Sequence, residues 1–563
     1  MSTAAATTGR GVLRSAITGQ RKPVLLGAVL AACHQGGEAL VPVVIGVVLD
    51  RAVANSSAWT LVGWLAVLAV VFVVLSFSYR FGSRAAERAA ERAAHEIRLA
   101  VSRRVLHPRG GAEQGALAGE LVSVGTSDAR RVGMINAVLP FGIAGLAGLV
   151  VSAVVLLRMS VPLGLLVLLG TPPLLFLAHL IGKPLEKRSE HEQERAAHAS
   201  GVAADLVSGL RVLKGIGAEP AAVTRYRRTS RDSLRATIRA ARAQAWHNGA
   251  LLALTGIFIA VVALVGGSLA ADGDISIGDL VATVGLAQFL QTPFAIFAWV
   301  NSQLAQARGS AGRVAAVLNA PPAVLGGAGE LPVPARGQVT LSAVSHGKLR
   351  DLDLAVPPGQ LLGVVTTDPA AATDLLDCLG RFADPPAGTV EVDALDLSTV
   401  DPDRVRSVVL VAAHDADLFE GTVEDNVRGG MPAVPSGVLA ASAADEVAAT
   451  LPSGTATAVT ERGRSLSGGQ RQRVALARAL TTDAPVLVLH DPTTAVDTVT
   501  EARIAEGVAA VRRDRTTIVV TTSPALLAAT DRVVLIEDGR VVAEGSHAEL
   551  VREQAGYRAA VLS

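Results

Sequence analysis

Cysteine, aromatic side chains and charge are all scarce in this chain. Only two of the 563 residues are cysteine, which excludes a disulfide framework. Aromatic residues make up 3% and charged residues 18%, against roughly 25% charged in a soluble globular protein. The 51 basic residues nearly balance 50 acidic ones, so nucleic acid is not expected as a partner. The length, well above the roughly 150 residues of one domain, excludes a single small binding module.

Apolar residues are abundant, and in the N-terminal part they form runs of about 20 residues, the length that crosses a bilayer core. A basic segment, residues 1–22, precedes the first run. That run is too long for a signal peptide and five more follow, so we expect it to remain as an anchor. The sequence predicts six transmembrane helices, approximately at Pro23–Leu49, Thr60–Phe81, Ile135–Leu157, Val161–Ile181, Ala245–Ala270 and Ile275–Ser302.

Basic residues of this region collect in two long connections, between the second and third runs and between the fourth and fifth. By the positive-inside rule, both connections and both termini face the cytoplasm. Long stretches without proline, such as Ser83–Val105 and Leu185–Leu213, predict that helices continue from the membrane into the cytoplasm. We therefore expect a multi-pass transmembrane domain over residues 23–318.

A second domain is expected after a linker rich in proline and glycine, residues 319–337. Over residues 338–563, short β-branched runs alternate with helical stretches, a pattern typical of an α/β domain with a largely parallel sheet. The predicted strands are Leu361–Val365, Val408–Ala412, Val486–Leu489, Thr517–Val520 and Val533–Ile536.

The most specific motif is Leu466-Ser467-Gly468-Gly469-Gln470, which precedes a helical stretch. A serine and two glycines that open a helix expose backbone N–H groups and the positive end of the helix dipole to an anion. The alternative is an ordinary capped helix. About twenty residues later, a buried strand ends in His490-Asp491, and Asp497 follows.

Together, these pieces resemble the signature, Walker B and D-loop motifs of an ATP-binding cassette (ABC) domain, with Asp497 in the D-loop. With six preceding spans, the chain resembles a half-transporter of the exporter-type ABC family, from about residue 20 to residue 555. The segments Gly119–Asp128 and Gly209–Glu219 resemble the family's coupling regions. The resemblance implies ATP and Mg²⁺ as cofactors, a plasma membrane location in a bacterium, and a six-helix bundle followed by a P-loop-type α/β domain.

The phosphate-binding loop departs from the family pattern. In G-x-x-x-x-G-K-[ST], glycines turn successive N–H groups toward the phosphates and the lysine neutralises them. Compared with this pattern, the corresponding stretch of the chain keeps the hydroxyl residue but lacks the lysine and both glycines. It also contains an aspartate and a proline. In order, the residues are Thr366 for the first glycine, Asp368, Pro369, Ala371 for the second glycine, Ala372 for the lysine, and Thr373 for the hydroxyl.

Other positions that the resemblance assigns to catalysis are also substituted. His490 replaces the Walker B aspartate, Asp491 the catalytic glutamate, His414 the Q-loop glutamine and Thr522 the switch histidine. Imidazole is a poor ligand for Mg²⁺, which prefers oxygen. A metal site at His490 with His414 is conceivable, but no cluster with ligand spacing accompanies them, so we expect no metal and a structural role for both histidines.

An intact signature beside an altered P-loop implies a heterodimer, because in this family each ATP lies between one P-loop and the opposite signature. We expect a partner half-transporter with intact Walker A, Walker B and switch histidine, to which this chain supplies its signature. Its own site is expected to bind ATP weakly or not at all; a variant loop that still binds ATP is the alternative. Two further functions are considered for the whole chain: an exporter-fold importer, for example of siderophores, and a non-transporting scaffold or regulator.

Few ionisable residues lie within the predicted spans. His34 and Glu38 are four residues apart in the first span and therefore share a helical face. They are candidates for contact with the transported substrate, because ionisable groups inside a membrane are costly; hydrogen bonding to neighbouring helices is the alternative. Gln288 and Gln291 in the sixth span are candidates for the same pathway, and none of these residues identifies the substrate.

Overall fold

The computed structural model describes residues 8–53, 58–414 and 417–562. The chain divides into two compact units. The first unit contains the residues up to Ser102 together with Gly119–Asn319, and the second contains Arg103–Ala118 together with the chain from Ala320 onward. The division after Asn319 lies at the predicted linker, whereas Arg103–Ala118, which we expected within the transmembrane domain, belongs to the second unit.

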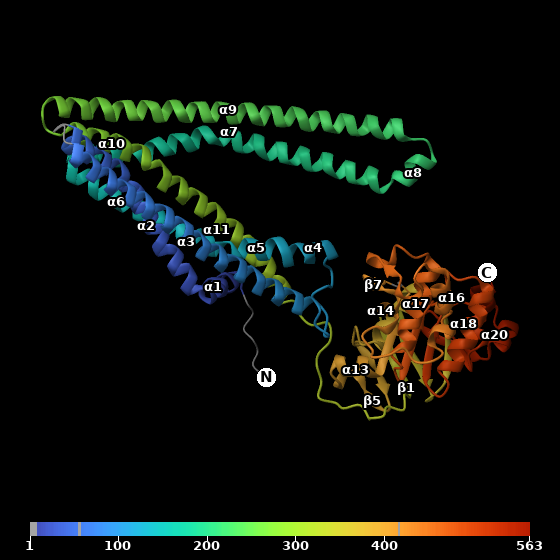
Figure 1. Ribbon diagram of the computed structural model, residues 1–563. Coiled ribbons are helices and arrows are strands. Elements are labelled where there is room, and N and C mark those ends of the chain that lie inside the picture. The colour runs from blue at the N-terminus through green and yellow to red at the C-terminus, as the bar shows by residue number, and fades with distance from the viewer. Residues whose placement is uncertain (1–7, 54–57, 415–416, 563) are drawn as a thin grey trace. The chain divides into compact units, whose positions relative to one another are not determined.

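The first unit has six helices long and apolar enough to cross a membrane, within the described residues (Figure 1). Three of them, of 48, 48 and 53 residues, are more than twice the roughly 20 residues that a bilayer requires. The six predicted spans are confirmed, as is their helical continuation. The helices are α2 (Arg21–Val48), α3 (Ala58–Val105), α6 (Ile135–Met159), α7 (Val161–Ser208), α9 (Glu219–Ala271), and α10 (Ile277–Phe289) followed by α11 (Gln291–Leu318).

Two helical details differ from the prediction. Helix α1 (Gly9–Gly19) forms within the basic N-terminal segment, with Thr8 as its cap and a buried apolar face. The expected helix Leu185–Leu213 ends at Ser208, because Gly209 leaves the helical conformation and a separate short helix, α8 (Leu210–Gly215), follows it. Glycine costs about 1 kcal/mol in a helix interior, which favours a break there.

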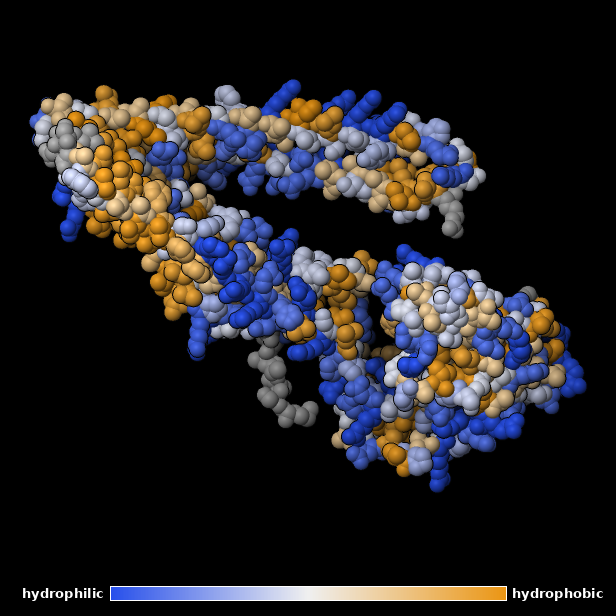
Figure 2. All heavy atoms as spheres, in the orientation of Figure 1, coloured by the Kyte–Doolittle hydropathy of each residue, from blue (hydrophilic) through white to orange (hydrophobic). Residues whose placement is uncertain are grey.

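Small residues let the helices of the first unit approach closely. A Cβ added to Gly133 in α5 (Ala129–Gly133) would lie 2.5 Å from the carbonyl oxygen of Ala90 on α3. Helix α7 packs along α9, and α2 packs on α6 and α10 (Figure 1). Apolar side chains gather over the region of α6 and α10, while hydrophilic ones cover the end of the bundle near α5 (Figure 2). This is the pattern of a helical bundle packed through small residues in a membrane.

A buried ion pair joins the start of the third span to the end of the sixth. Asp128, in the π-helical turn η2 (Val124–Asp128) that follows α4 (Ala118–Ser123), has a side chain only 2% exposed. Its carboxylate accepts hydrogen bonds from the guanidinium of Arg313 (2.8 and 2.5 Å) and from Ser310 Oγ (2.8 Å), both on α11. The paired charges keep both groups satisfied at this packed helix crossing.

The second unit is built on a six-stranded sheet with the order β12-β11-β3-β10-β9-β6. Neighbouring strands are parallel except for the edge pair β11 and β12. All five predicted strands are confirmed and lie in this sheet. The strands are β3 (Leu361–Thr366), β6 (Val409–Ala412), β9 (Val486–His490), β10 (Thr516–Val520), β11 (Arg532–Glu537) and β12 (Arg540–Gly545).

The sheet is accompanied by an antiparallel sheet, two short paired strands and helices on its faces (Figure 1). The antiparallel sheet, ordered β2-β1-β4-β5, comprises β1 (Val339–His346), β2 (Leu349–Val356), β4 (Ala387–Val392) and β5 (Leu395–Asp396), and the short pair is β7 (Gly421–Thr422) with β8 (Ala458–Val459). The α-helices are α12 (Pro369–Leu379), α13 (Pro402–Val408), α14 (Val423–Arg428), α15 (Val438–Ala441), α16 (Ala444–Thr450), α17 (Gly468–Thr481), α18 (Thr498–Val511), α19 (Pro524–Ala528), α20 (His547–Glu553) and α21 (Ala555–Leu562).

Hydrogen bonds fasten the segment Arg103–Ala118 to the second unit. Arg104 donates to the carbonyl oxygen of Ala320 (2.7 Å), and Arg109 Nη2 donates to Asp401 Oδ2 (3.1 Å). A second bond from Arg104, to the carbonyl oxygen of Gly110 (2.9 Å), lies within the segment. The Arg109 guanidinium holds the pKa of Asp401 below its usual range. The connection between the second and third spans is thereby joined to the α/β unit through side-chain and backbone contacts.

Candidate nucleotide site and signature helix

The carboxyl ends of four neighbouring parallel strands, β3, β10, β9 and β6, meet at one edge of the sheet. Ligands of open α/β sheets bind at this edge. Each strand is followed there by residues that the sequence placed in the nucleotide site. These are Thr366–Thr373 after β3, Thr522 after β10, His490 and Asp491 at the end of β9, and His414 after β6.

Side chains of the loop between β3 and α12 accept hydrogen bonds from two of the loop's own backbone N–H groups. Asp368 is the N-cap of α12, and its Oδ1 accepts a hydrogen bond from the backbone N–H of Ala370 (2.9 Å). Thr366 Oγ1 accepts the N–H of Asp368 (3.3 Å), and Pro369, at the first helical position, has no N–H to offer. A carboxylate of the chain itself therefore occupies the helix N-terminus at which a phosphate would otherwise bind.

The next side chains of α12 are buried in the core or hydrogen-bonded to the helix itself. Ala371 and Ala372 are each only 3% exposed and pack in the main apolar core of the second unit. Thr373 is exposed, but its Oγ1 donates to the carbonyl oxygen of Pro369 in the preceding turn (3.1 Å). The position expected for the lysine is thus part of the core.

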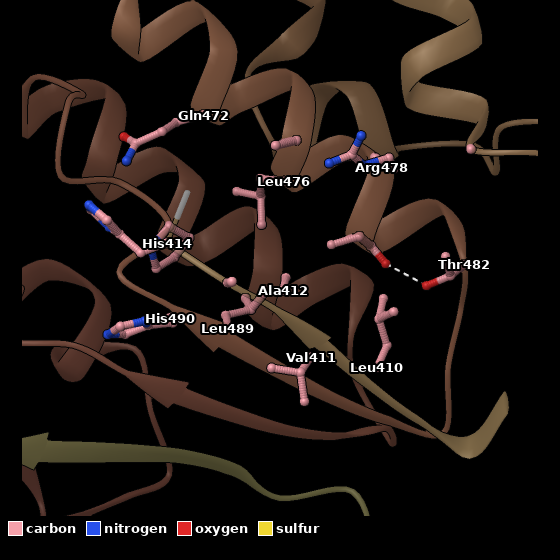
Figure 3. Close-up of a pocket in the computed structure, with 15 residues that line it drawn as sticks. Leu410, Val411, Ala412, His414, Gln472, Leu476, Arg478, Thr482, Leu489 and His490 are labelled. Carbon is pink, nitrogen blue, oxygen red and sulfur yellow. Dashed lines mark hydrogen bonds between the residues drawn. The ribbon is translucent and has the colours of Figure 1, made fainter. Parts of the chain in front are cut away.

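The two histidines lie side by side at one end of a cavity of about 370 Å³ (Figure 3). The ring centroids of His414 and His490 are 5.9 Å apart, and His490 Nε2 is 3.8 Å from Asp491 Oδ2. Asp491 has a positive φ of 44° and donates its N–H to the carbonyl oxygen of Val520 (2.9 Å). Thr522 is exposed at the same edge. The described residues contain no group of three or more His, Cys, Asp or Glu placed to hold a metal ion.

Sequence reasoning predicted the helix that lines the other wall of this cavity, α17, but did not assign its Gln472 or Arg478 to the site. Gln472 and Arg478 of α17 face it (Figure 3), and burial lowers the pKa of Arg478. Gln472 donates to Thr494 Oγ1 and accepts the N–H of Ala495, both at 2.7 Å. The sequence could have indicated Gln472 as a site residue, because it lies four residues after Gly468 and therefore shares a helical face with the signature.

The signature motif forms the start of α17. Ser467 is an exposed N-cap, and its Oγ accepts the N–H of Gln470 (3.3 Å), while Gln470 Oε1 accepts the N–H of Ser467 (2.8 Å) in a capping box. Leu466 is buried beneath it. A Cβ at Gly469 would lie 2.5 Å from the carbonyl oxygen of Ala495, so glycine is needed for this close approach.

Asp497, in the expected D-loop, caps the next helix. Its Oδ1 accepts the N–H of Thr500 (3.0 Å) at the start of α18. Hydrogen bonds from the backbone N–H and the side chain of Thr500 lower the pKa of Asp497. The D-loop and the signature of the same chain are therefore joined through Ala495 and Gln472 and held by two capped helices.

Three of the four candidate residues in the membrane part lie together. His34, Glu38 and Gln288 line one cavity of about 830 Å³ in the first unit. The Nδ1–H of His34 donates to the carbonyl oxygen of Leu75 (3.0 Å). Gln291 does not line that cavity, and its Oε1 accepts a hydrogen bond from Thr255 Oγ1 on α9 (3.3 Å).

Two family models match the chain, one in each of its parts. The ABC transporter transmembrane region matches residues 24–294, and the ABC transporter domain matches residues 349–494. The chain joins an ABC transporter transmembrane region to an ABC ATPase domain. It is thus a membrane protein with the organisation of an exporter-type ABC half-transporter, as the sequence motifs predicted.

Curated relatives of this ABC protein carry several names. The chain is 31% identical over 551 residues to the multidrug efflux ATP-binding/permease protein of Mycobacterium bovis, covering 96% of this chain and 46% of that protein. It is 29% identical over 387 residues to the ATP-dependent lipid A-core flippase of Desulfotalea psychrophila (67% and 68%). It is also 30% identical over 463 residues to the human mitochondrial potassium channel ATP-binding subunit (78% and 62%). The chain spans about half the length of the first of these relatives.

Proposed function

We propose that this chain is one subunit of a heterodimeric, ATP-driven ABC transporter with an exporter fold, located in the plasma membrane of a bacterium with both termini in the cytoplasm. Its signature, Leu466–Gln470, contacts the ATP and Mg²⁺ held by the P-loop of a second half-transporter. Its own nucleotide site, facing the partner's signature, does not hydrolyse ATP. The cargo is a small molecule, peptide or lipid.

The observation that supports this proposal is the capping of α12 by Asp368. A phosphate that approached this helix would meet a like charge, at a cost of roughly 4 kcal/mol for unit charges 4 Å apart at an effective dielectric near 20. The missing lysine removes a charge-assisted hydrogen bond of about 1.5–3 kcal/mol. Even half of this total weakens ATP binding by more than about a hundredfold.

The geometry of the signature supports its use in an ATP site completed by another chain. A capped, exposed helix start with two glycines presents backbone N–H groups to an anion from outside the chain. The Mycobacterium bovis relative is about twice as long as the stretch that aligns, because that stretch covers 46% of it. A single chain of that length has room for two halves, and we propose that here the second half is a separate polypeptide.

A non-transporting regulator is the second candidate, because one group of relatives is named as the ATP-binding subunit of a potassium channel. In that case the domain would dimerise without completing an ATP site, and changes at Gly468 would leave the partner's ATPase activity unaltered. An exporter-fold importer would use the same ATP site, and only the direction of transport in proteoliposomes separates it from an exporter.

The test is ATP hydrolysis by the purified full-length chain, alone and in complex with the half-transporter encoded beside it. We expect no turnover above background from this chain alone, and at least about tenfold more from the complex, because only the complex has a complete site. Turnover by this chain alone that disappears on Asp491→Asn would contradict the proposal.

A further inference from the structure

Two neighbouring cavities lie among the helices of the membrane unit, with volumes of about 250 and 830 Å³. They share four lining residues from three helices: His34 and Glu38 on α2, Tyr79 on α3 and Thr292 on α11. Their walls are mainly apolar, with a few polar and charged side chains among the lining residues. This combination is typical of a small-molecule binding site.

Glu38 is the acidic residue in the middle of this region. Asp279 is the other acid in the predicted spans, but it lies in the first turn of α10 and belongs to a capping box there. Glu38 accepts a hydrogen bond from Gln35 Nε2 (3.0 Å), and no ion pair joins it to a basic side chain of the described residues. A carboxylate at membrane depth without a counter-charge is costly, so it favours a cation from outside the chain.

Aromatic rings are concentrated in the walls of the same two cavities. The whole chain has only 11 Phe, 4 Trp and 3 Tyr, yet four of these residues line the two cavities. Aromatic faces attract cations, and the attraction is strongest where water is excluded. The four residues are Phe72, Tyr79, Phe141 and Phe289.

Arg80 also lines the larger cavity, but at a different level of the bundle. Two close contacts show which residues of α2 and α3 lie opposite each other. A Cβ at Gly82 of α3 would contact Leu30 of α2, and a Cβ at Gly37 of α2 would contact Leu75 of α3. The backbone of Arg80 therefore lies opposite the turn of α2 that precedes His34. Along the helix axis this is about six residues from Glu38, or roughly 9 Å at 1.5 Å per residue. The smaller cavity is lined by Glu38 but not by Arg80.

We propose that Glu38 and its surrounding aromatic rings bind the positive charge of an apolar organic cation, which is the substrate class of this subunit's transport pathway. The carboxylate provides the counter-charge, Gln35 orients it, and the rings contact the apolar groups that surround the charge. Arg80 keeps the cationic centre at the Glu38 end of the larger cavity. This inference rests on the proposed transport function for its biological meaning, but the binding itself does not require ATP.

The test measures equilibrium binding of radiolabelled tetraphenylphosphonium to the full-length chain in phosphatidylcholine nanodiscs, with empty nanodiscs subtracted. Tetraphenylborate, an anion of nearly the same shape, is the matched probe. We expect Glu38→Gln to weaken tetraphenylphosphonium binding at least about tenfold, because a charge-assisted contact is lost. Tetraphenylborate should bind the variant as well as or better than it binds the wild type, which also reports that the cavity is intact.

Control variants separate the cavity from general charge effects. Glu87→Gln removes an exposed carboxylate elsewhere on α3 and should change neither affinity. Glu38→Asp keeps the charge and should retain tetraphenylphosphonium binding within about threefold. Unchanged tetraphenylphosphonium binding by Glu38→Gln, or equal loss of both probes by both Glu38 variants, would overturn the inference. ATP hydrolysis by the complex with the partner is measured separately from cation binding, so a failure of the proposed transport function can be distinguished from a failure of this inference.

Discussion

Replacing Gly468 with aspartate is expected to lower ATP hydrolysis by the complex of this chain and its partner at least about a hundredfold. The new carboxylate stands at the N-terminus of α17, where the proposed γ-phosphate of the partner's ATP lies. Like charges 4 Å apart at an effective dielectric near 20 repel by roughly 4 kcal/mol, which exceeds the energy of a hundredfold change. Steady-state phosphate release by the purified complex measures the effect.

Gly468→Ala is the matched control for this substitution. A Cβ at Gly468 would lie 3.5 Å from the Cβ of Ala495, an ordinary contact, so alanine should fit and retain most of the activity. The same substitution at Gly469 is unsuitable as a control, because its Cβ would collide with the carbonyl oxygen of Ala495. If Gly468→Asp left the ATPase activity of the complex intact, the chain would act as a scaffold and not as a donor of the signature.

Ala372→Lys is expected to unfold the α/β domain more easily without restoring ATP hydrolysis to this chain. Ala372 is 3% exposed in the core, and a lysine there must bury its charge or displace the packed face of α12. Overpacking alone costs about 1–3 kcal/mol, and burial of an unpaired charge adds to this cost. Thermal melting should therefore shift down while phosphate release by the chain alone stays at background.

Thr367→Lys tests whether the loss of stability in Ala372→Lys comes from the buried position or from the added charge alone. Thr367 is exposed in the same loop, so the added ammonium remains in water and the melting temperature should be close to that of the wild type. A gain of ATPase activity in Ala372→Lys alone, without loss of stability, would mean that the substitutions at His490, Asp491 and Thr522 do not matter for hydrolysis.

The large-scale architecture could be predicted because hydropathy and strand pattern are strong local signals. Runs of about 20 apolar residues and short β-branched strands each have a physical period that does not depend on distant contacts. The order of motifs identified the residues that follow β3, β10, β9 and β6, and the parallel sheet brings them to one edge. The role of these residues in nucleotide binding stays a prediction.

Other features of the fold depend on tertiary packing and could not be predicted from the sequence. Helix α1 forms inside a basic segment because Val12 and Leu13 are buried by neighbouring helices. The attachment of Arg103–Ala118 to the second unit depends on contacts such as Arg104 with Ala320, more than 200 residues away. The alignment identified Ala372 as a missing lysine, but only the structure shows that its side chain lies in the core.

The central claim is that hydrolysis in the assembled transporter uses only the P-loop of the other polypeptide. Vanadate trapping of a photoreactive ATP analogue with Mg²⁺, followed by mass-spectrometric mapping of the cross-linked peptides, tests it most directly. We expect trapped label on the partner's P-loop and none on Thr366–Thr373 of this chain. Trapped label on Thr366–Thr373, or trapping by this chain when purified without a partner, would contradict it.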